Sequence, residues 1–148
     1  MSNLSTENRS SLLEEAGRCL KCKVPRCKKN CPVSTDIPLV MELFLAGKEQ
    51  EAGEALFENN PLSAICSIVC PHENNCYGNC VLGIKQTPIS FYQIEQYISG
   101  KYISNCEIDR PAKNGMKIAV IGAGPAGISM SIFMAQKGFH VTLVEAQD

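Results

Sequence analysis

The sequence has little of several features that mark common protein classes. It contains no tryptophan, only two histidines and a formal net charge of −1 over 148 residues. That balance of charge argues against a general nucleic-acid or membrane-surface binder. No run approaches about 18 consecutive apolar residues, so no membrane-spanning helix is predicted. The first 11 residues are polar and lack the apolar region of a secretory signal, so we expect a cytoplasmic protein.

Cysteine is the residue that the sequence has in excess, with nine in all. The density is below that of a small secreted disulfide scaffold, and an odd count would leave one thiol unpaired. Regularly spaced cysteines in a cytosolic protein are more often ligands than disulfides. They form a first quartet followed by Pro32, a second quartet, and a last thiol that we expect to be free in a polar linker: Cys19, Cys22, Cys27 and Cys31; Cys66, Cys70, Cys76 and Cys80; and Cys106.

The spacing of the first quartet favours an iron–sulfur site over a zinc site. A four-cysteine zinc site usually joins two close pairs through a longer loop. Here the four cysteines lie close together and proline follows the last, much as in the bacterial ferredoxin run. A zinc-stabilised interaction module without a redox role is the alternative from another class. Counted from the residues alone, the two quartets give eight thiolates, and Cys66 completes the second site.

Basic residues surround the first quartet, at Arg18, Lys21, Lys23, Arg26, Lys28 and Lys29. They are open to three interpretations: a solvated face, a nucleic-acid contact, or positive charge that favours the thiolate form and offsets a cluster. If seven of these eight thiolates bind two cluster cores of charge +2, the formal charge of the protein is −1 − 7 + 4, or about −4, which does not suit a DNA binder. The two histidines, His72 and His140, have no partner motif, and we interpret both as structural.

The first part of the chain is expected to be helical and the last part to open a nucleotide-binding fold. Apolar periodicity predicts helices from Ser5 or Thr6 towards Cys19, over 37–45 with Asp36 as N-cap, and over 49–58, 61–69 and 88–99, the last ended by Gly100. No strand is predicted before residue 116. We place a boundary near residue 112, which gives a helical domain at 1–111 and an incomplete β-α-β segment at 112–148.

The β-α-β segment carries a dinucleotide fingerprint. A buried strand is predicted at 117–121, a helix at 128–137 and a second strand at 140–144. Gly122, Gly124 and Gly127 follow the first strand directly, and Glu145 closes the second at about the spacing of a ribose-binding acid. Such glycines permit a tight turn, close approach of a pyrophosphate and helix–strand packing.

Taken together, these motifs resemble the N-terminal iron–sulfur domain shared by the small subunit of bacterial glutamate synthase and by dihydropyrimidine dehydrogenase. The large subunit of NADH-dependent ferredoxin:NADP oxidoreductase is similar too. The resemblance rests on the cysteine–proline runs at 19–32 and 66–71, the Glu58–Leu62 stretch, the Cys76/Cys80 pair, Pro88–Ile89, Ile94–Glu95 and the 120–127 fingerprint. It covers most of the chain from about residue 12.

The resemblance implies two [4Fe-4S] clusters whose ligands are exchanged between the quartets. One cluster would take Cys19, Cys22, Cys27 and Cys80. The other would take Cys31, Cys70, Cys76 and a non-cysteine ligand, which falls on Glu95; Cys66 is then a packed bystander, and it is the alternative to Glu95. The resemblance also implies FAD at the fingerprint, with Gly122, Gly124, Pro125, Ala126, Gly127 and Glu145 as its contacts, and NAD(P)H at a second fingerprint that this sequence does not contain.

The expected function is electron transfer inside a flavin-dependent oxidoreductase. NAD(P)H would reduce FAD, and electrons would pass through the two clusters to FMN in a partner domain or subunit. The glutamate synthase small-subunit type is the preferred assignment, with a dihydropyrimidine dehydrogenase subunit or the ferredoxin:NADP oxidoreductase large subunit as the alternative. No residue resembles a general acid, base or nucleophile. We expect the chain to be a piece of a larger enzyme. By itself, the chain is expected to lack catalytic activity and to bind FAD weakly or not at all.

Overall fold

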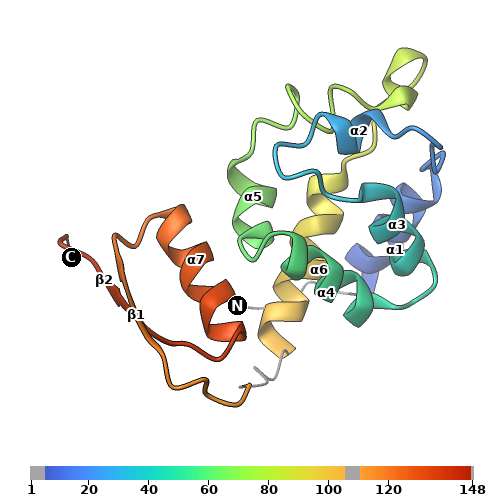
Figure 1. Cartoon of the computed structure of the whole chain (residues 1–148). Helices are drawn as coiled ribbons and strands as arrows, with labels where there is room; N and C mark the ends of the chain where they lie inside the picture. The colour runs from blue at the N-terminus through green and yellow to red at the C-terminus, as the bar shows by residue number, and fades with distance from the viewer. Residues whose placement is uncertain (1–5, 106–110, 148) are drawn as a thin grey trace. The chain divides into compact units, whose positions relative to one another are not determined.

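The computed structural model describes residues 6–105 and 111–147, with side chains from Arg9 onward. The protein is mainly helical, with one two-stranded parallel sheet. It divides after Asn105 into two compact units, whose elements are labelled in Figure 1. We call residues 6–105 the helical unit and residues 111–147 the second unit. The predicted domain boundary near residue 112 stays a prediction, and Cys106 lies outside the described residues.

The helical unit follows the predicted order of helices, connected by the cysteine loops. Its elements are α1 (Thr6–Gly17), α2 (Arg26–Lys29), α3 (Ile37–Leu45), α4 (Glu49–Asn59), α5 (Ser63–Val69), a 3-10 turn η1 (Val81–Ile84) and α6 (Phe91–Asn105). The predicted cap is confirmed at α3, where the Asp36 carboxylate accepts a hydrogen bond from the Leu39 amide at 3.4 Å. No strand occurs in the described part of this unit, as expected.

Helix α6 is the element that the sequence predicted least well. It begins at Phe91 and continues to Asn105, so the expected end at Gly100 is wrong. The reason lies in the packing of α6 against α4: a Cβ added to Gly53 would come within 2.5 Å of the Tyr102 side chain. This close contact holds the last turns of α6 in place and offsets the roughly 1 kcal/mol that glycine costs inside a helix.

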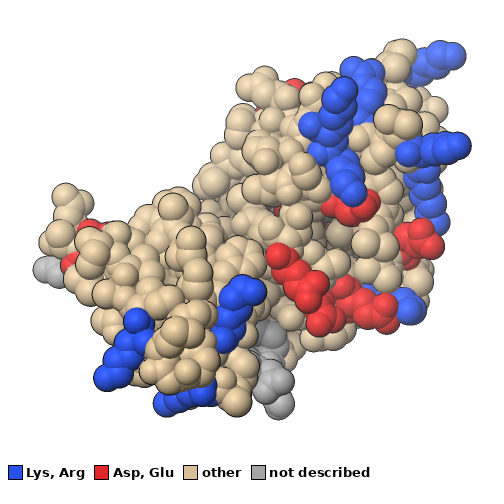
Figure 2. Space-filling model, in the orientation of Figure 1, with Lys and Arg blue, Asp and Glu red and all other residues tan. Residues whose placement is uncertain are grey.

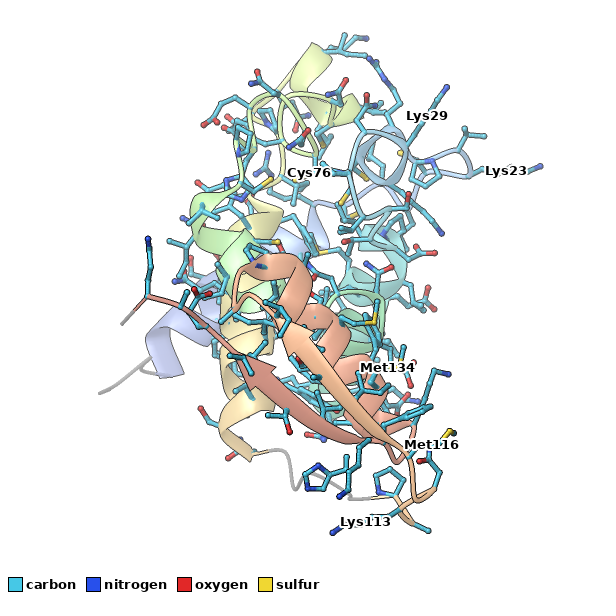
Figure 3. All side chains as sticks on the ribbon, turned by 60° about the vertical axis from the view of Figure 1, so that its left-hand side comes forward. Lys23, Lys29, Cys76, Lys113, Met116 and Met134 are labelled. Atoms are coloured by element: carbon cyan, nitrogen blue, oxygen red, sulfur yellow. The ribbon has the colours of Figure 1, made fainter. Side chains whose placement is uncertain are left out.

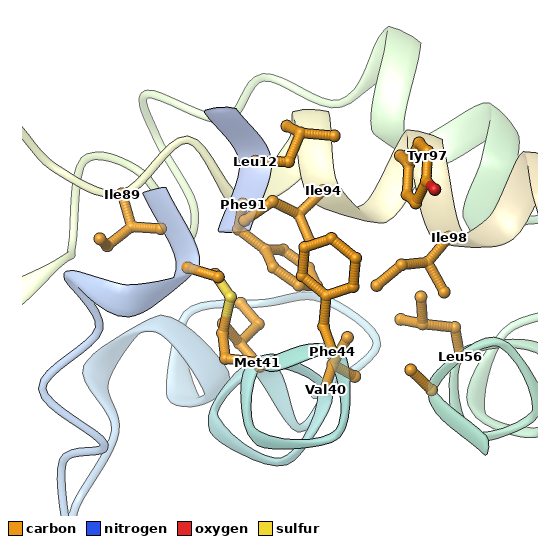
Figure 4. Close-up of a cluster of buried hydrophobic side chains, with 13 residues drawn as sticks. Leu12, Val40, Met41, Phe44, Leu56, Ile89, Phe91, Ile94, Tyr97 and Ile98 are labelled. Carbon is orange, nitrogen blue, oxygen red and sulfur yellow. The ribbon is translucent and has the colours of Figure 1, made fainter. Parts of the chain in front are cut away.

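The core of the helical unit is apolar and is formed by the facing sides of α1, α3, α4 and α6 (Figure 4). Its most deeply buried large side chains are Phe44, Met41, Leu56, Ile94, Ile98 and Val40. Two leucines near helix ends lie outside this core. Leu20 follows the end of α1 and is 57% exposed, and Leu45 is the last residue of α3 and is 38% exposed. The core thus lies below the cysteine loops and fixes the helices that carry them.

In the second unit, the predicted strands are confirmed. Strands β1 (Lys117–Ile121) and β2 (His140–Val144) run parallel with Lys117 opposite His140, and α7 (Pro125–Gln136) connects them. Helix α7 begins three residues before its predicted start because Gly124 is the N-cap and Pro125 suits the first turn. The prediction of a buried β1 is wrong: alternate residues are exposed, and Ile121 is 81% exposed. In the described part of this unit, α7 is the only helix that packs on the sheet.

None of the helices in the described ranges combines the length and the apolar character that crossing a bilayer requires.

Candidate functional site: two groups of cysteine side chains

The first group of thiols comes from both quartets. Cys19 and Cys22 lie in the loop after α1, Cys27 lies in α2, and Cys80 lies directly before η1. All four line one pocket, whose other walls are mostly apolar: Leu20, Pro25, Arg26, Pro38, Val81, Leu82 and Ile89. The structure therefore brings together the four residues that the resemblance assigned to one cluster. Their apolar surroundings limit the access of water to whatever these thiols bind.

The thiols of this first group interact electrostatically. The pKa of Cys27 is raised to about 11, mainly by burial and to a smaller extent by the neighbouring thiols of Cys80, Cys19 and Cys22. Burial also raises the pKa of Cys19, with smaller contributions from Cys22 and Cys80. Several half-buried thiols disfavour one another's ionisation, and a bound positive centre relieves that repulsion. Because these thiols are protonated at neutral pH, their binding to a metal centre as thiolates would release protons.

The second group brings together residues from four separate segments. The pKa of the Cys76 thiol is raised to about 12, mainly by burial and to a smaller extent by the charges of Glu95, Cys31 and Cys70. Cys31 follows α2, Cys70 ends α5, Cys76 lies in the turns after it, and Glu95 lies on α6. These are the three thiols and the carboxylate that the resemblance assigned to the other cluster.

Glu95 is a carboxylate buried in the helical unit, and only 8% of its surface is exposed. The Ser63 hydroxyl donates a hydrogen bond of 2.7 Å to Oε1, and the Ser99 hydroxyl in turn donates to Ser63 at 3.1 Å. Burial raises the pKa of Glu95 to about 7, against the opposing effect of the Ser63 hydrogen bond. A buried carboxylate is stable when it is paired or bound to a metal, so Glu95 is suited to act as a ligand.

Cys66 lies on α5. Its sulfur accepts a hydrogen bond from the Asn60 side-chain amide at 3.2 Å, and the sulfur of Cys70 accepts one of the same length from Asn75. The role of Cys66 as a packed bystander stays a prediction, as do the two ligand sets.

The chemistry of these donors fits the expected cofactor. Thiolates are the ligands of iron–sulfur clusters, and a [4Fe-4S] cluster takes four ligands, commonly all cysteines. Within the described residues, no three His, Cys, Asp or Glu side chains come close enough around one point to hold a single metal ion. Each group would hold its cluster through several loops rather than one.

The backbone of the first quartet adopts a rare conformation at two positions. Lys21, between Cys19 and Cys22, has φ of +46°, and Ser34, three residues after Cys31, has φ of +55°. Residues with a Cβ rarely adopt positive φ, and each such position costs roughly 1–3 kcal/mol. Both lie beside predicted ligands, where they redirect the chain.

Positive side chains gather around the first quartet (Figure 2). Two of them are paired: Lys28 with Asp36 at 2.5 Å and Arg18 with Glu15 at 2.5 Å. Within the described ranges, Lys21, Lys23, Arg26 and Lys29 make no ion pair. Figure 3 shows Lys23 and Lys29 pointing away from the fold. These cations are placed to offset the negative charge of ligated thiolates.

His72 lies beside the second group in the sequence, and the sequence alone indicated no role for it beyond a structural one. His72 is 9% exposed, its imidazole stacks on Tyr92 with ring centroids 4.4 Å apart, and its Nε2 is buried without a hydrogen-bond partner. The sequence signal that could have drawn attention to His72 is its position between Cys70 and Cys76. The spacing of metal ligands does not predict a role for the residues that lie between them.

The glycine loop of the second unit is held by a close backbone contact and by the side chain of Glu145. Gly122 has φ of +98°, and a Cβ on Gly127 would lie 1.8 Å from the Gly122 carbonyl oxygen, whereas a Cβ on Gly124 would meet open space. Glu145 accepts a hydrogen bond of 2.7 Å from the Ala123 amide. Backbone amides of Ala123, Gln147 and Ala146 lower the pKa of Glu145. The predicted contacts of FAD with this loop and with Glu145 stay predictions.

The fold and the thiol groups define a helical iron–sulfur domain followed by a β-α-β unit. Residues 2–107 match the family model for dihydropyrimidine dehydrogenase domain II, 4Fe-4S cluster, and the chain belongs to this family. Residues 76–148 match the model for pyridine nucleotide-disulphide oxidoreductases.

Curated relatives of two kinds are similar to the chain. The NAD-dependent dihydropyrimidine dehydrogenase subunit PreT of Escherichia coli K12 is 32% identical over 91% of the chain and 33% of its own length. The small chain of glutamate synthase [NADPH] from Azospirillum brasilense is 34% identical over 91% of the chain and 29% of its own length. The chain thus spans about a third of these relatives, which are oxidoreductases.

Proposed function

We propose that the chain carries electrons through two [4Fe-4S] clusters in an NAD(P)H-dependent flavin oxidoreductase. The single observation that carries this proposal is the pocket lined by Cys19, Cys22, Cys27 and Cys80, which draws four thiols from both quartets. When bound, a cluster supplies reversible one-electron storage at a potential that its surroundings tune. The family model, defined by a 4Fe-4S cluster, favours this cofactor over the zinc-stabilised module.

The chain's residues would have separate tasks in this function. Cys19, Cys22, Cys27 and Cys80 would hold one cluster, and Cys31, Cys70, Cys76 and Glu95 would hold the other. Cations such as Arg26 would offset the thiolate charge. In the second unit, the open space at Gly124 and the N-terminus of α7 suit the pyrophosphate of FAD. Electrons from this flavin would leave the clusters for an FMN-containing partner domain or subunit.

Two assignments within this class are supported by relatives of similar identity. Glutamate synthase small chains and dihydropyrimidine dehydrogenase subunits both include relatives that are 34% identical to the chain, so identity does not separate the two types. We prefer the glutamate synthase type. Mixing the natural protein with a glutamate synthase large subunit and measuring glutamate formation from glutamine and 2-oxoglutarate tests it. Reduction of uracil by the natural protein with its own partner would instead identify the second type.

The cluster proposal is tested by anaerobic reconstitution of the chain with iron and sulfide. We expect a brown protein with the iron and sulfide content of two clusters and a visible absorbance that dithionite bleaches. The Cys27→Ser variant should lose one cluster and keep the other. A colourless protein that instead takes up stoichiometric zinc under the same conditions would contradict the proposal.

A further inference from the structure

The imidazole of His72 is the buried polar group whose environment the fold leaves incomplete. It is more than nine-tenths buried, and its Nε2 has no hydrogen-bond partner. Leaving a buried donor or acceptor unsatisfied costs about 1–3 kcal/mol, so such a group needs an explanation. Because a neutral imidazole can carry its proton on Nε2, this nitrogen can act as a donor to an acceptor that the polypeptide does not supply.

The position of His72 places it beside the second group of ligands. It lies between Cys70 and Cys76 in the chain, and both thiols belong to that group. Its ring stacks on Tyr92 at an interplanar angle of 21°, and Tyr92 lies one helical turn before Glu95 on α6. The imidazole is thus flanked in the sequence by Cys70 and Cys76, and its ring packs against α6, the helix that carries Glu95.

The backbone around His72 is rigid as well. Its carbonyl oxygen accepts hydrogen bonds from the amides of Asn75, Tyr77 and Gly78, at 3.1 to 3.2 Å. Gly78 is required for this turn, because a Cβ there would lie 1.7 Å from the Glu73 carbonyl oxygen. The stacked ring and the hydrogen-bonded turn together leave Nε2 little freedom to seek another partner.

We propose that His72 donates a hydrogen bond from Nε2 to a sulfur of the cluster held by Cys31, Cys70, Cys76 and Glu95, and so raises its reduction potential. This inference rests on the proposed function. Reduction adds negative charge to the cluster, and a hydrogen bond to sulfur stabilises the more negative state. His72 is on this account a positioning residue that tunes the cluster without ligating it.

The first test uses the whole chain without substitution at His72. Because the sequence holds only His72 and His140, growth with ¹⁵N-histidine labels two residues, and the His140→Asn variant leaves one. After anaerobic reconstitution and reduction, pulsed EPR should detect ¹⁵N coupling to one of the two clusters, and the coupling should persist in His140→Asn. Two intact clusters without any ¹⁵N coupling would overturn the inference and leave the proposed function standing.

The second test measures potentials. His72→Phe keeps a ring to stack on Tyr92 but removes the donor, and we expect the reduction equilibrium of one cluster to fall about tenfold, which is about 59 mV for one electron. The other cluster should keep its potential. His72→Gln retains an N–H donor and should stay within about a third of that shift.

The outcomes of these tests distinguish the inference about His72 from the proposed function. Equal potentials in wild type and His72→Phe, at full iron content, would overturn the inference. If His72→Phe fails to load a cluster, the ¹⁵N coupling and the His72→Gln potential decide in its place. A wild-type chain that takes up no cluster under reconstitution would overturn the proposed function and this inference together.

Discussion

At the scale of single residues, neighbours in sequence separate into different groups. Cys27 and Cys31 lie four residues apart, yet the thiol of Cys27 interacts with Cys19, Cys22 and Cys80, whereas Cys31 interacts with Cys76. Helix α2 ends at Lys29, so these two cysteines do not share one helical face. Which thiols lie near one another depends on how the loops fold over the core. Spacing alone does not indicate this grouping, and the ligand sets that the resemblance implies stay a prediction.

The identity of the eighth ligand leads to the first prediction. We expect Glu95→Ala to remove one of two clusters, because the buried carboxylate completes the second group. Cys66→Ala should retain both, since the resemblance implies that Cys66 is not a ligand. Iron content and EPR of the reconstituted variants measure this. The opposite pattern, with two clusters in Glu95→Ala and one in Cys66→Ala, would assign the eighth position to Cys66.

A second prediction at this scale concerns the glycine loop. Gly127→Ala should destabilise the second unit by about 1–3 kcal/mol, because its Cβ would clash with the Gly122 carbonyl oxygen. Gly124→Ala is the matched control, since the added methyl meets open space and Gly124 has negative φ. Hydrogen exchange of the β1 and β2 amides reports on this unit separately. Equal exchange in the two variants would show that the close contact is not needed.

At the scale of elements, features that short stretches of sequence encode were predicted correctly, whereas features that depend on tertiary contacts were not. The cap at Asp36 and both strands are encoded in short stretches of sequence, and the structure has them where predicted. Helix α6 passes Gly100 because Tyr102 packs on Gly53 of α4, a contact between residues far apart in sequence. Exposure of β1 also depends on what covers the sheet, which the apolar composition of the strand does not reveal.

An ion-pair network between three helices gives a third prediction. Glu49 at the start of α4 accepts hydrogen bonds from Arg9 of α1 at 2.6 Å and from Lys101 of α6 at 2.5 Å. Burial raises the pKa of Glu49, but these two partners lower it more, so the net pKa lies below its ordinary value. The stabilisation is therefore present above about pH 4.5 and is lost as the pH falls through the lowered pKa of the folded state.

We expect Glu49→Gln to lower the free energy of unfolding by about 1 kcal/mol at pH 7 and by nearly nothing at pH 3. Urea unfolding of the apo chain, followed by helical circular dichroism, measures the difference. Glu51→Gln is the control, because its pair with Lys48 is exposed within one helical turn and should contribute much less. A Glu49→Gln effect that persists unchanged at pH 3 would contradict the electrostatic explanation.

At the scale of the whole molecule, all proposed cluster ligands belong to one of the two units. Each proposed ligand lies in the helical unit, on a loop or on a helix. Binding energy for the clusters is then folding energy for that unit alone. The second unit contributes none of these ligands, so its stability should be independent of iron.

Removal of the clusters gives the fourth prediction. Treatment with a chelator and an oxidant should lower the Tm of the helical unit by about 10 °C or more, as expected for the loss of a tightly bound ligand. Hydrogen exchange should rise in α3 and α6 and stay unchanged in β1 and α7. Comparison of the same chain before and after treatment provides the control. A uniform rise across both units would show that they unfold together.

The left-handed backbone at Lys21 and Ser34 has a consequence for what these two positions tolerate. A residue with a Cβ held at positive φ costs roughly 1–3 kcal/mol, whereas glycine adopts the same conformation without that cost. Neither residue is a proposed ligand, so glycine at either position would relieve strain in the loop without removing a donor. At these two positions the demands of site geometry and of stability therefore oppose each other.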